Sequence, residues 1–294
     1  MVIKIYRAVV PDFIRTFLHD LFIEDVLYFL RNWRVYLISI KTKLGLANSS
    51  QFDKEYNVIL KFGPTPYCWE FRKEYRKNEI IIGYDNEKNL NYFDLEGKRM
   101  FLPVEYSKRK LKKLVWSLLI EQDIRSPHRY VKSYDELSNK ILFDVGAAEG
   151  IFSLMAIEYV SKVFLFEYNE IWIRALQETF KPWKEKVVLI PQKVGVSNDN
   201  DAVTLSTFLL SKKVDSIFLK MDIEGAEIEV LHEIKSVLSS QSNIELAVCT
   251  YHRPDDFATI KSILESINYS INPTEGTIYF NGSFNKVLIK SKKN

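Results

Sequence analysis

Three carboxylates stand close together in the stretch Asp222-Ile223-Glu224-Gly225-Ala226-Glu227. It follows an apolar run over residues 216–221 and begins a long amphipathic segment, so we expect it where a buried strand gives way to a helix. In open α/β sheets, ligands bind in the crevice at the carboxyl ends of the strands. A related turn, Asp144-Val145-Gly146-Ala147-Ala148-Glu149-Gly150, lies upstream. The two stretches together predict a nucleotide-like cofactor and an enzyme.

The upstream turn has the features of a nucleoside site. Gly146 permits a tight turn and a close approach of a ligand to the backbone, and Gly150 allows the following helix to pack closely. Glu167 ends the next predicted strand, where an acid usually accepts hydrogen bonds from ribose hydroxyls. The two glycines and this acid therefore predict that the cofactor contains a nucleoside.

Charge narrows the choice of nucleoside. A dinucleotide fingerprint, Gly-x-Gly-x-x-Gly, places a pyrophosphate at the helix N-terminus, but here Ala148 occupies the region of the middle glycine. Asp144 and Glu149 would disfavour a pyrophosphate and favour a cofactor with a sulfonium and an ammonium group. S-adenosylmethionine carries both groups and a ribose for Glu167. Glu149 is equally well interpreted as an acid that complements the helix dipole.

Alternating strands and helices must position these residues. From residue 140 onward the pattern predicts strands at 140–145, 162–167, 186–190, 214–221 and 244–250, with helices at 149–160, up to 180, 225–239 and 254–267. Residues 277–280 and 286–289 read as a hairpin around Asn281-Gly282. The expected fold class is α/β, a Rossmann-like, doubly wound and mostly parallel sheet with an antiparallel pair at its edge.

The N-terminal part has a different pattern. Residues 11–45 read as helical, and residues 57–104 look strand-rich, with two strands within 92–103 around a Glu-Gly turn. Ser107 is placed to cap a helix that runs through Gln122. We therefore expect an accessory region at 1–125 that contacts the acceptor, a membrane or a partner, and a cofactor-binding domain at 126–294.

Composition limits the class of protein. The net charge of +3 is small and the C-terminal half is acidic, so nucleic acid is not the expected partner. Cys68 and Cys249 are far apart in sequence, which suits a reducing, cytoplasmic compartment, and neither a signal peptide nor a spanning run of apolar residues is seen. The first 45 residues interleave aromatic and aliphatic residues with arginines. They suit either a helical cap on the core or a helix pair on the inner face of a membrane.

The motifs resemble those of the FkbM family of class I methyltransferases. The resemblance rests on Phe143–Gly150, on Phe166-Glu167-Tyr168-Asn169 and on the stretch from Phe218 to Glu227, and it covers about residues 125–290. It implies a seven-stranded sheet with S-adenosylmethionine across its carboxyl edge. It also implies O-methylation, frequently of sugars or natural products.

The resemblance also implies roles for single residues. Asp144, Gly146 and Gly150, with Ala148 and Glu149 beside them, would surround the methionine end of the cofactor. Glu167 would hold the ribose, with Tyr168 and Asn169 near the adenosine. Asp222 would lie between the cofactor and the acceptor.

Methyl transfer from a sulfonium to a hydroxyl is an in-line displacement, and a general base near the hydroxyl should help. Asp222 is the first candidate, and His252, which follows the fifth strand, is the second. Glu224 is a third catalytic candidate. Glu224 and Glu227 either form an acidic helix start, bind the acceptor, or hold a divalent ion together with Asp222. A divalent ion is not expected, because the sequence does not supply a complete set of oxygen ligands.

Three functions follow from these observations. The leading one is an O-methyltransferase for a saccharide or glycoconjugate hydroxyl, as in polysaccharide biosynthesis. The second is a methyltransferase for a small natural product or a protein, and the third is a non-catalytic scaffold that keeps the cofactor pocket. The acceptor itself and the oligomeric state cannot be derived from the sequence.

Overall fold

The computed structural model describes residues 24–46, 51–63, 65–75, 79–211 and 216–294. The first part of the helix expected over residues 11–45 lies outside these residues. The remainder is confirmed as α3, Glu24–Lys43.

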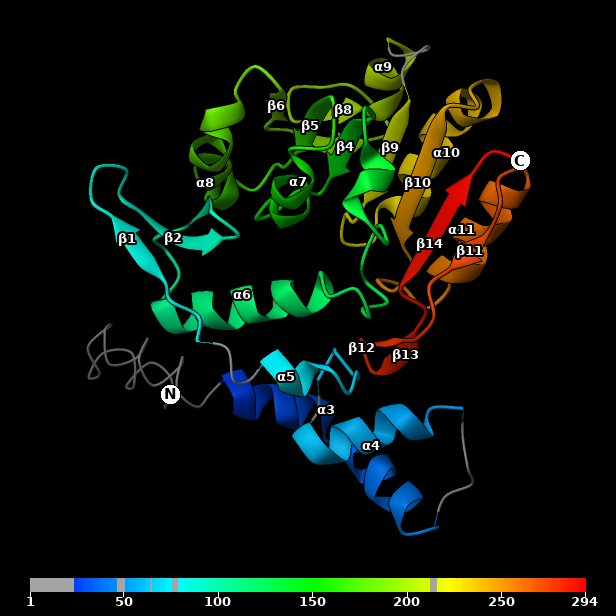
Figure 1. Cartoon of the computed structure of the whole chain (residues 1–294). Helices are drawn as coiled ribbons and strands as arrows, with labels where there is room; N and C mark the ends of the chain where they lie inside the picture. Colours follow the sequence, from blue (N-terminus) through cyan, green and yellow to red (C-terminus); the bar gives the residue numbers. More distant parts are fainter. Residues whose placement is uncertain (1–23, 47–50, 64, 76–78, 212–215) are drawn as a thin grey trace, which may run out of the picture.

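A seven-stranded sheet forms the centre of the molecule, in the order β11-β14-β10-β9-β4-β5-β6 (Figure 1). Five strands run parallel, and β14 and β11 add an antiparallel edge. The bounds are β4 Ile141–Val145, β5 Lys162–Phe166, β6 Val187–Ile190, β9 Ile217–Met221, β10 Ile244–Cys249, β11 Asn272–Pro273 and β14 Leu288–Lys292. Every residue of β4 and β9 is buried, as expected for strands covered on both faces. The predicted fold class is confirmed.

Helices cover both faces of the sheet, and two apolar clusters mark the two layers. On one face α7 (Ile151–Ala156) and α8 (Glu170–Phe180) pack against the alternate strand residues Leu142, Leu165 and Phe218, and α6 (Lys108–Glu121) adds its buried residues to the same apolar cluster. On the other face α9 (Leu205–Leu210), α10 (Glu227–Ser240) and α11 (Asp256–Glu265) pack against Phe143, Phe166 and Leu219. This alternation is the two-residue period of a strand, and it makes the fold doubly wound.

In the N-terminal part, the structure confirms two of the predictions made from the sequence and contradicts one. The side chain of Ser107 accepts a hydrogen bond from the backbone N–H of Lys110 at the start of α6, as predicted. The strands β2 (Leu90–Leu95) and β3 (Lys98–Leu102) pair around the Glu-Gly turn, with β1 (Gly83–Asp85) beside them. The expectation of strand structure from residue 57 is wrong, because residues 57–62 belong to the helix α4, Asp53–Phe62. Apolar residues at three-residue spacing in that segment follow a helical period.

The predicted hairpin also needs correction. Asn281-Gly282 does form a turn, with φ of 48° and 86°, but it joins β12 (Ile278–Phe280) to β13 (Ser283–Asn285). A two-residue loop brings the very next residues into register, so residues 286–289 are too far along to pair across it. The segment from Leu288 instead belongs to the central sheet as β14.

The β12–β13 hairpin carries the contact with the N-terminal helices (Figure 1). The N–H of Tyr279 donates to the carbonyl of Pro66 at 3.0 Å, and the indole N–H of Trp69 donates to the carbonyl of Thr277 at 2.8 Å. The ring of Phe284 packs against Phe52, which precedes α4, and against Tyr56 in the first turn of this helix. The short helix α5, Arg72–Tyr75, follows this contact. Residues 24–75 are thereby joined to the end of the sheet that carries the candidate site.

A small parallel pair, β7 (Lys193–Gly195) and β8 (Ala202–Thr204), was not predicted from the sequence. Lys193 and Val194 of β7 line the cavity described below. No helix in the part of the chain that the structure describes is long and apolar enough to cross a membrane.

Candidate active site

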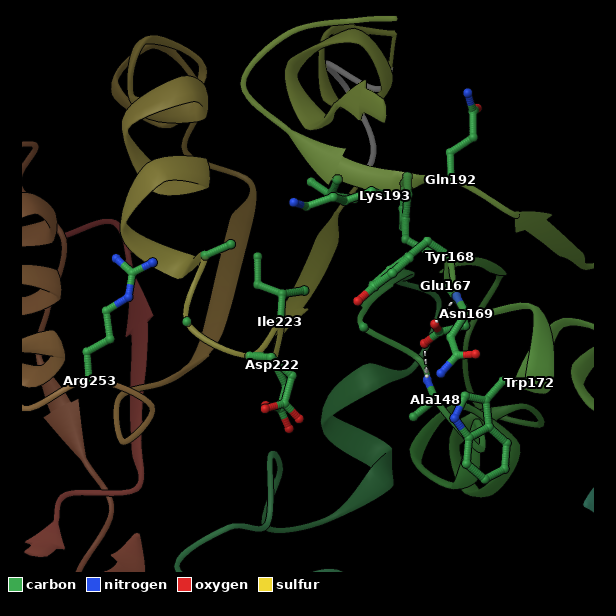
Figure 2. Close-up of a pocket in the computed structure, with 16 residues that line it drawn as sticks. Ala148, Glu167, Tyr168, Asn169, Trp172, Gln192, Lys193, Asp222, Ile223 and Arg253 are labelled. Carbon is green, nitrogen blue, oxygen red and sulfur yellow. Dashed lines mark hydrogen bonds between the residues drawn. The ribbon is translucent and has the colours of Figure 1, made fainter. Parts of the chain in front are cut away.

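A cavity of about 420 Å³ opens at the carboxyl ends of β4, β5 and β9 (Figure 2). This volume is within the range of small-molecule sites, and its position is the one expected for ligands of open α/β sheets. Seven of the residues predicted for the site or adjoining it line the cavity: Gly146, Ala148, Glu167, Tyr168, Asn169, Asp222 and Glu224. The three loops named by the sequence motifs therefore do meet at one place.

Gly146 lets the loop after β4 touch the loop after β9. Its φ is +79°, and a Cβ atom there would lie 1.8 Å from the backbone oxygen of Asp222. The N–H of Asp222 in turn donates to the carbonyl of Val145. A side chain at position 146 would therefore push the Asp222 loop away from the cavity.

Glu167 is held by the backbone of both neighbouring loops. Its Oε2 accepts a hydrogen bond from the N–H of Ala148 at 2.8 Å, and its Oε1 accepts one from the N–H of Asn169 at 2.7 Å (Figure 2). Ala148 adopts a left-handed φ of 45° in making this contact. Each carboxylate oxygen can accept more than one hydrogen bond, so Glu167 can still take hydroxyl donors from a ligand.

Asp144 lies behind the cavity rather than on its wall. Its Oδ1 is 2.9 Å from the ammonium group of Lys220, and its Oδ2 accepts a hydrogen bond from Ser153 at 2.6 Å. Asp144 and Lys220 are 1% and 5% exposed, so the two charges compensate each other within the core. Lys220 also donates to the carbonyl of Gly146 and thereby supports the turn that lines the cavity.

Gly150 and Glu149 also lie outside the cavity lining. A Cβ atom on Gly150 would come within 3 Å of Leu176 and Phe180 of α8, which confirms the close helix packing expected of this glycine. Burial raises the pKa of Glu149 to about 8. Burial thus favours the protonated form of Glu149, and Asp144 is already paired. The negative charge that faces the cavity comes from Glu167, Asp222 and Glu224 instead.

Asp222 receives polar groups from three directions. Its Oδ2 accepts a hydrogen bond from the hydroxyl of Tyr130 at 2.9 Å and lies 3.8 Å from Nε2 of His128. Its Oδ1 lies 3.4 Å from Nε2 of His252. Burial alone would raise the pKa of Asp222, but Lys220 and the two histidines outweigh it and lower this pKa. Asp222 is therefore an anion at neutral pH.

His252 lies between two carboxylates. Its Nδ1 is 2.9 Å from Oε1 of Glu227, which has no exposed surface, while its Nε2 faces Asp222. Burial would lower the pKa of His252, but Glu227 and Asp222 outweigh it and raise this pKa. The two acids approach different nitrogens of one ring, so the ring itself connects them. This arrangement suits the holding and passing of a proton.

Glu224 lies at the rim. Its side chain is 88% exposed, its φ is +55°, and its Oε2 is 3.9 Å from Nε2 of His252. It can therefore meet an acceptor that enters from solvent. Glu227 is different, because its Oε1 accepts the N–H of Ile223 at 2.9 Å inside the protein. Glu227 does stand at the start of α10, but its carboxylate also faces His252, so it is more than an acid at a helix start.

Sequence reasoning missed the roles of His128 and Tyr130. They precede the first strand of the sheet, and Nε2 of His128 also lies 3.1 Å from the hydroxyl of Tyr251. Both side chains are buried, at 2% and 3% exposure. Nothing in the spacing of residues 126–130 places them beside Asp222, because the contact spans more than ninety residues and depends on the fold.

Comparisons with known proteins extend this description. The family described as "Methyltransferase FkbM domain" matches residues 51–271. A search among curated proteins finds no match.

Solved structures show low similarity. The methyltransferase FkbM of Methylobacillus flagellatus KT is 19% identical over 60% of this chain, with a TM-score of 0.43, and the match spans about half (54%) of that structure. TYW2 of M. jannaschii in complex with AdoMet is 18% identical over 74% of this chain and 94% of that one, with a TM-score of 0.40. Magnesium protoporphyrin IX methyltransferase of Synechocystis PCC 6803 with bound SAM is 14% identical over 63% and 78%, with a TM-score of 0.38. At these values the similarities bear on neither substrate nor site residues.

Proposed function

This chain belongs to the FkbM methyltransferase family, and on that premise we propose that it methylates a hydroxyl oxygen of a saccharide or glycoconjugate. The observation that carries the proposal is the row Asp222, His252, Glu227, which begins at Asp222 on the cavity wall and continues behind it; Glu167 lines the same cavity. One end of this cavity suits a nucleoside and the other suits the removal of a proton.

The residues present fit S-adenosylmethionine, which supplies a methyl group on a sulfonium with a good leaving group. Glu167 would accept the ribose hydroxyls, and Tyr168 and Asn169 would lie near the adenosine (Figure 2). Gly146 and Asp222 would face the methionine end. The support is that Glu167 is fixed by two backbone N–H groups and still has acceptor capacity toward the cavity.

Asp222 and His252 would share the handling of the proton. A hydroxyl becomes a better nucleophile when a neighbouring group accepts its hydrogen bond, and Asp222 is an anion on the cavity wall. As the oxygen gains the methyl group it must lose its proton. Because the pKa of Asp222 is lowered, this carboxylate holds a proton only weakly. We therefore assign the proton that leaves the hydroxyl to Nε2 of His252, which lies 3.4 Å from Oδ1 of Asp222. Glu227 would stabilise the charged ring from its other side.

A substitution at Asp222 tests the catalytic part. Asp222→Asn keeps the size of the side chain and removes its charge, so we expect S-adenosylmethionine to bind and turnover to fall by about a hundredfold or more. Methylation at the wild-type rate by this variant would exclude Asp222 from proton handling.

The acceptor is tested in cells. Mass spectrometry of glycans and lipid-linked saccharides from cells with and without the protein should show a methyl group that depends on it. If the glycans are unchanged and a small molecule or a protein is methylated instead, the acceptor belongs to one of those two classes. No product of any kind would favour a non-catalytic scaffold.

We also propose that α3 contacts the surface of an anionic membrane. Val35 and Ser39 of this helix are buried, while a separate face of the same helix is apolar and exposed. The exposed side chains are Phe29, Leu30, Trp33 and Leu37. Arg34 and Lys41 flank this stripe. An apolar stripe with aromatic residues and flanking cations is the pattern of helices that lie in a membrane interface.

A further inference from the structure

A second cavity, of about 600 Å³, lies between α3 and the β12–β13 hairpin. Tyr28, Arg31 and Asn32 of the helix line one side, and residues 279–282 line the other. Pro66 completes the wall, and the N–H of Tyr279 donates to its carbonyl. The cavity is thus formed by three segments that lie far apart in the sequence, and the backbone hydrogen bond joins two of them, the hairpin and Pro66.

The lining combines aromatic rings with planar polar groups. The rings of Tyr28, Tyr279 and Phe280 offer apolar faces, and Asn32 and Asn281 carry amides that can both donate and accept. Aromatic walls with a few convergent hydrogen-bonding groups bind compact ligands that are apolar on one side and polar on the other. A sugar ring has this character, because its C–H bonds and hydroxyls lie on different sides.

Arg31 adds a positive charge to this lining. Within the ranges that the structure describes, no carboxylate pairs with its guanidinium group. A guanidinium fork matches a carboxylate or a phosphate in two parallel hydrogen bonds. The cavity therefore suits a sugar that carries an anionic group better than a neutral one.

The hairpin connects this cavity to the candidate active site. The amide of Asn281 donates to the carbonyl of His252 at 3.3 Å. The ring of Phe280 lies 5.8 Å from the ring of His252 and 5.3 Å from that of Tyr251. Two residues of the cavity wall thus touch the histidine that faces Asp222.

We propose that this cavity binds an anionic sugar unit of the acceptor, other than the unit that is methylated. The inference rests on the proposed function and adds that the acceptor is longer than one sugar and negatively charged. Binding outside the reaction centre holds the reacting hydroxyl in place, and such remote contacts are a common source of rate enhancement.

Saturation-transfer NMR on the full chain, without S-adenosylmethionine, tests the inference. The probes are glucose 1-phosphate, glucuronic acid and glucose, each alone; inorganic phosphate, which has no C–H proton to observe, is added as a competitor of glucose 1-phosphate. We expect the first two to bind more tightly than glucose and phosphate, and their order tells whether a phosphate or a carboxylate is preferred. Equal binding of glucose, or binding of phosphate as tight as that of glucose 1-phosphate, would overturn the proposal.

Two variants locate the binding. Arg31→Gln should weaken both anionic sugars by about tenfold, as expected for the loss of a charge-assisted pair. Lys54→Gln removes a charge from the exposed surface of α4, away from the cavity, and should leave binding unchanged. Tyr28→Leu provides a second test on a ring that is partly exposed and should also weaken both sugars. Wild-type affinity in Arg31→Gln and Tyr28→Leu, with unchanged thermal unfolding, would contradict the site.

Failure here can be told apart from failure of the proposed function. Sugar binding that is lost in Arg31→Gln and Tyr28→Leu depends on the second cavity, and cofactor binding measured by calorimetry depends on the first. Loss of sugar binding with intact cofactor binding and glycan methylation would remove only this inference.

Discussion

Nδ1 of His252 lies 2.9 Å from Oε1 of Glu227, and Glu227 is completely buried. A carboxylate in this position orients the imidazole ring and stabilises its protonated form. The two residues follow different strands, so the relationship depends on the packing of the loops after β9 and β10.

Glu227→Gln should lower the pKa of His252, because it removes one of the three carboxylates, Glu227, Asp222 and Glu224, that raise it. NMR titration of the imidazole signals follows this directly, since the chain has only four histidines. Glu229→Gln, on the exposed side of the same helix, should leave the pKa unchanged. An unaltered titration of His252 in Glu227→Gln would contradict the role of Glu227.

The raised pKa of His252 also predicts how the free energy of unfolding depends on pH. The raised pKa of His252 means that the folded state holds its proton more tightly than the unfolded state. This contribution is complete below about pH 6.5 and is lost as the pH rises through the folded-state pKa. The free energy of unfolding should therefore fall across that window, and it should fall less in Glu227→Gln. Denaturant titrations at several pH values measure both slopes.

Lys220→Met should destabilise the fold by about 3–5 kcal/mol, because it leaves Asp144 charged, buried and unpaired. Lys181→Met, which breaks an exposed pair with Glu178, should cost less than about 1 kcal/mol. Urea unfolding compares the two variants. Equal losses would mean that the Lys220–Asp144 pair does not act as a buried pair.

Much of the core could be predicted because its signals are local. Apolar runs of strand length and amphipathic segments recur from residue 140 onward, and the turns that follow 145, 166 and 221 stand at strand ends. Parallel strands bring their carboxyl ends to one edge, so the cavity could be placed from the sequence.

The polar partners could not be predicted, because they arise between elements. Lys220 reads as a single polar residue in an apolar strand, and only the pairing of β9 with β4 places it beside Asp144. The contact of Tyr130 with Asp222 likewise has no periodic signal. The error at residues 57–62 has a different cause, since short apolar runs suit either helix or strand and packing decides between them.

Gly146→Ala should disrupt the site far more than Gly97→Ala. Both glycines have φ near +80°, but a Cβ atom meets the Asp222 backbone at position 146 and nothing within 4 Å at position 97. The left-handed backbone alone should cost about 1–2 kcal/mol at position 97. Urea unfolding should show a larger loss at position 146, and equal losses would contradict the close contact of the two loops.

Replacing Trp33 and Leu37 by serine should weaken binding to vesicles of phosphatidylglycerol and phosphatidylcholine by about tenfold or more, since both side chains lose apolar contact. Vesicle sedimentation measures this. Serine at Ile81 and Ile124, which are also exposed, should have no such effect. Binding that is equal in both double variants, or insensitive to anionic lipid, would reject α3 as the contact.

The most direct test of the account is calorimetric titration of the chain with S-adenosylmethionine. The wild type should bind it, Glu167→Ala should lose most of the affinity, and Tyr168→Ala, which changes a 65% exposed side chain, should weaken binding without loss of folding. Glu170→Ala, at the exposed start of α8, should bind as the wild type does. Wild-type affinity in both Glu167→Ala and Tyr168→Ala would show that the cofactor does not occupy this cavity.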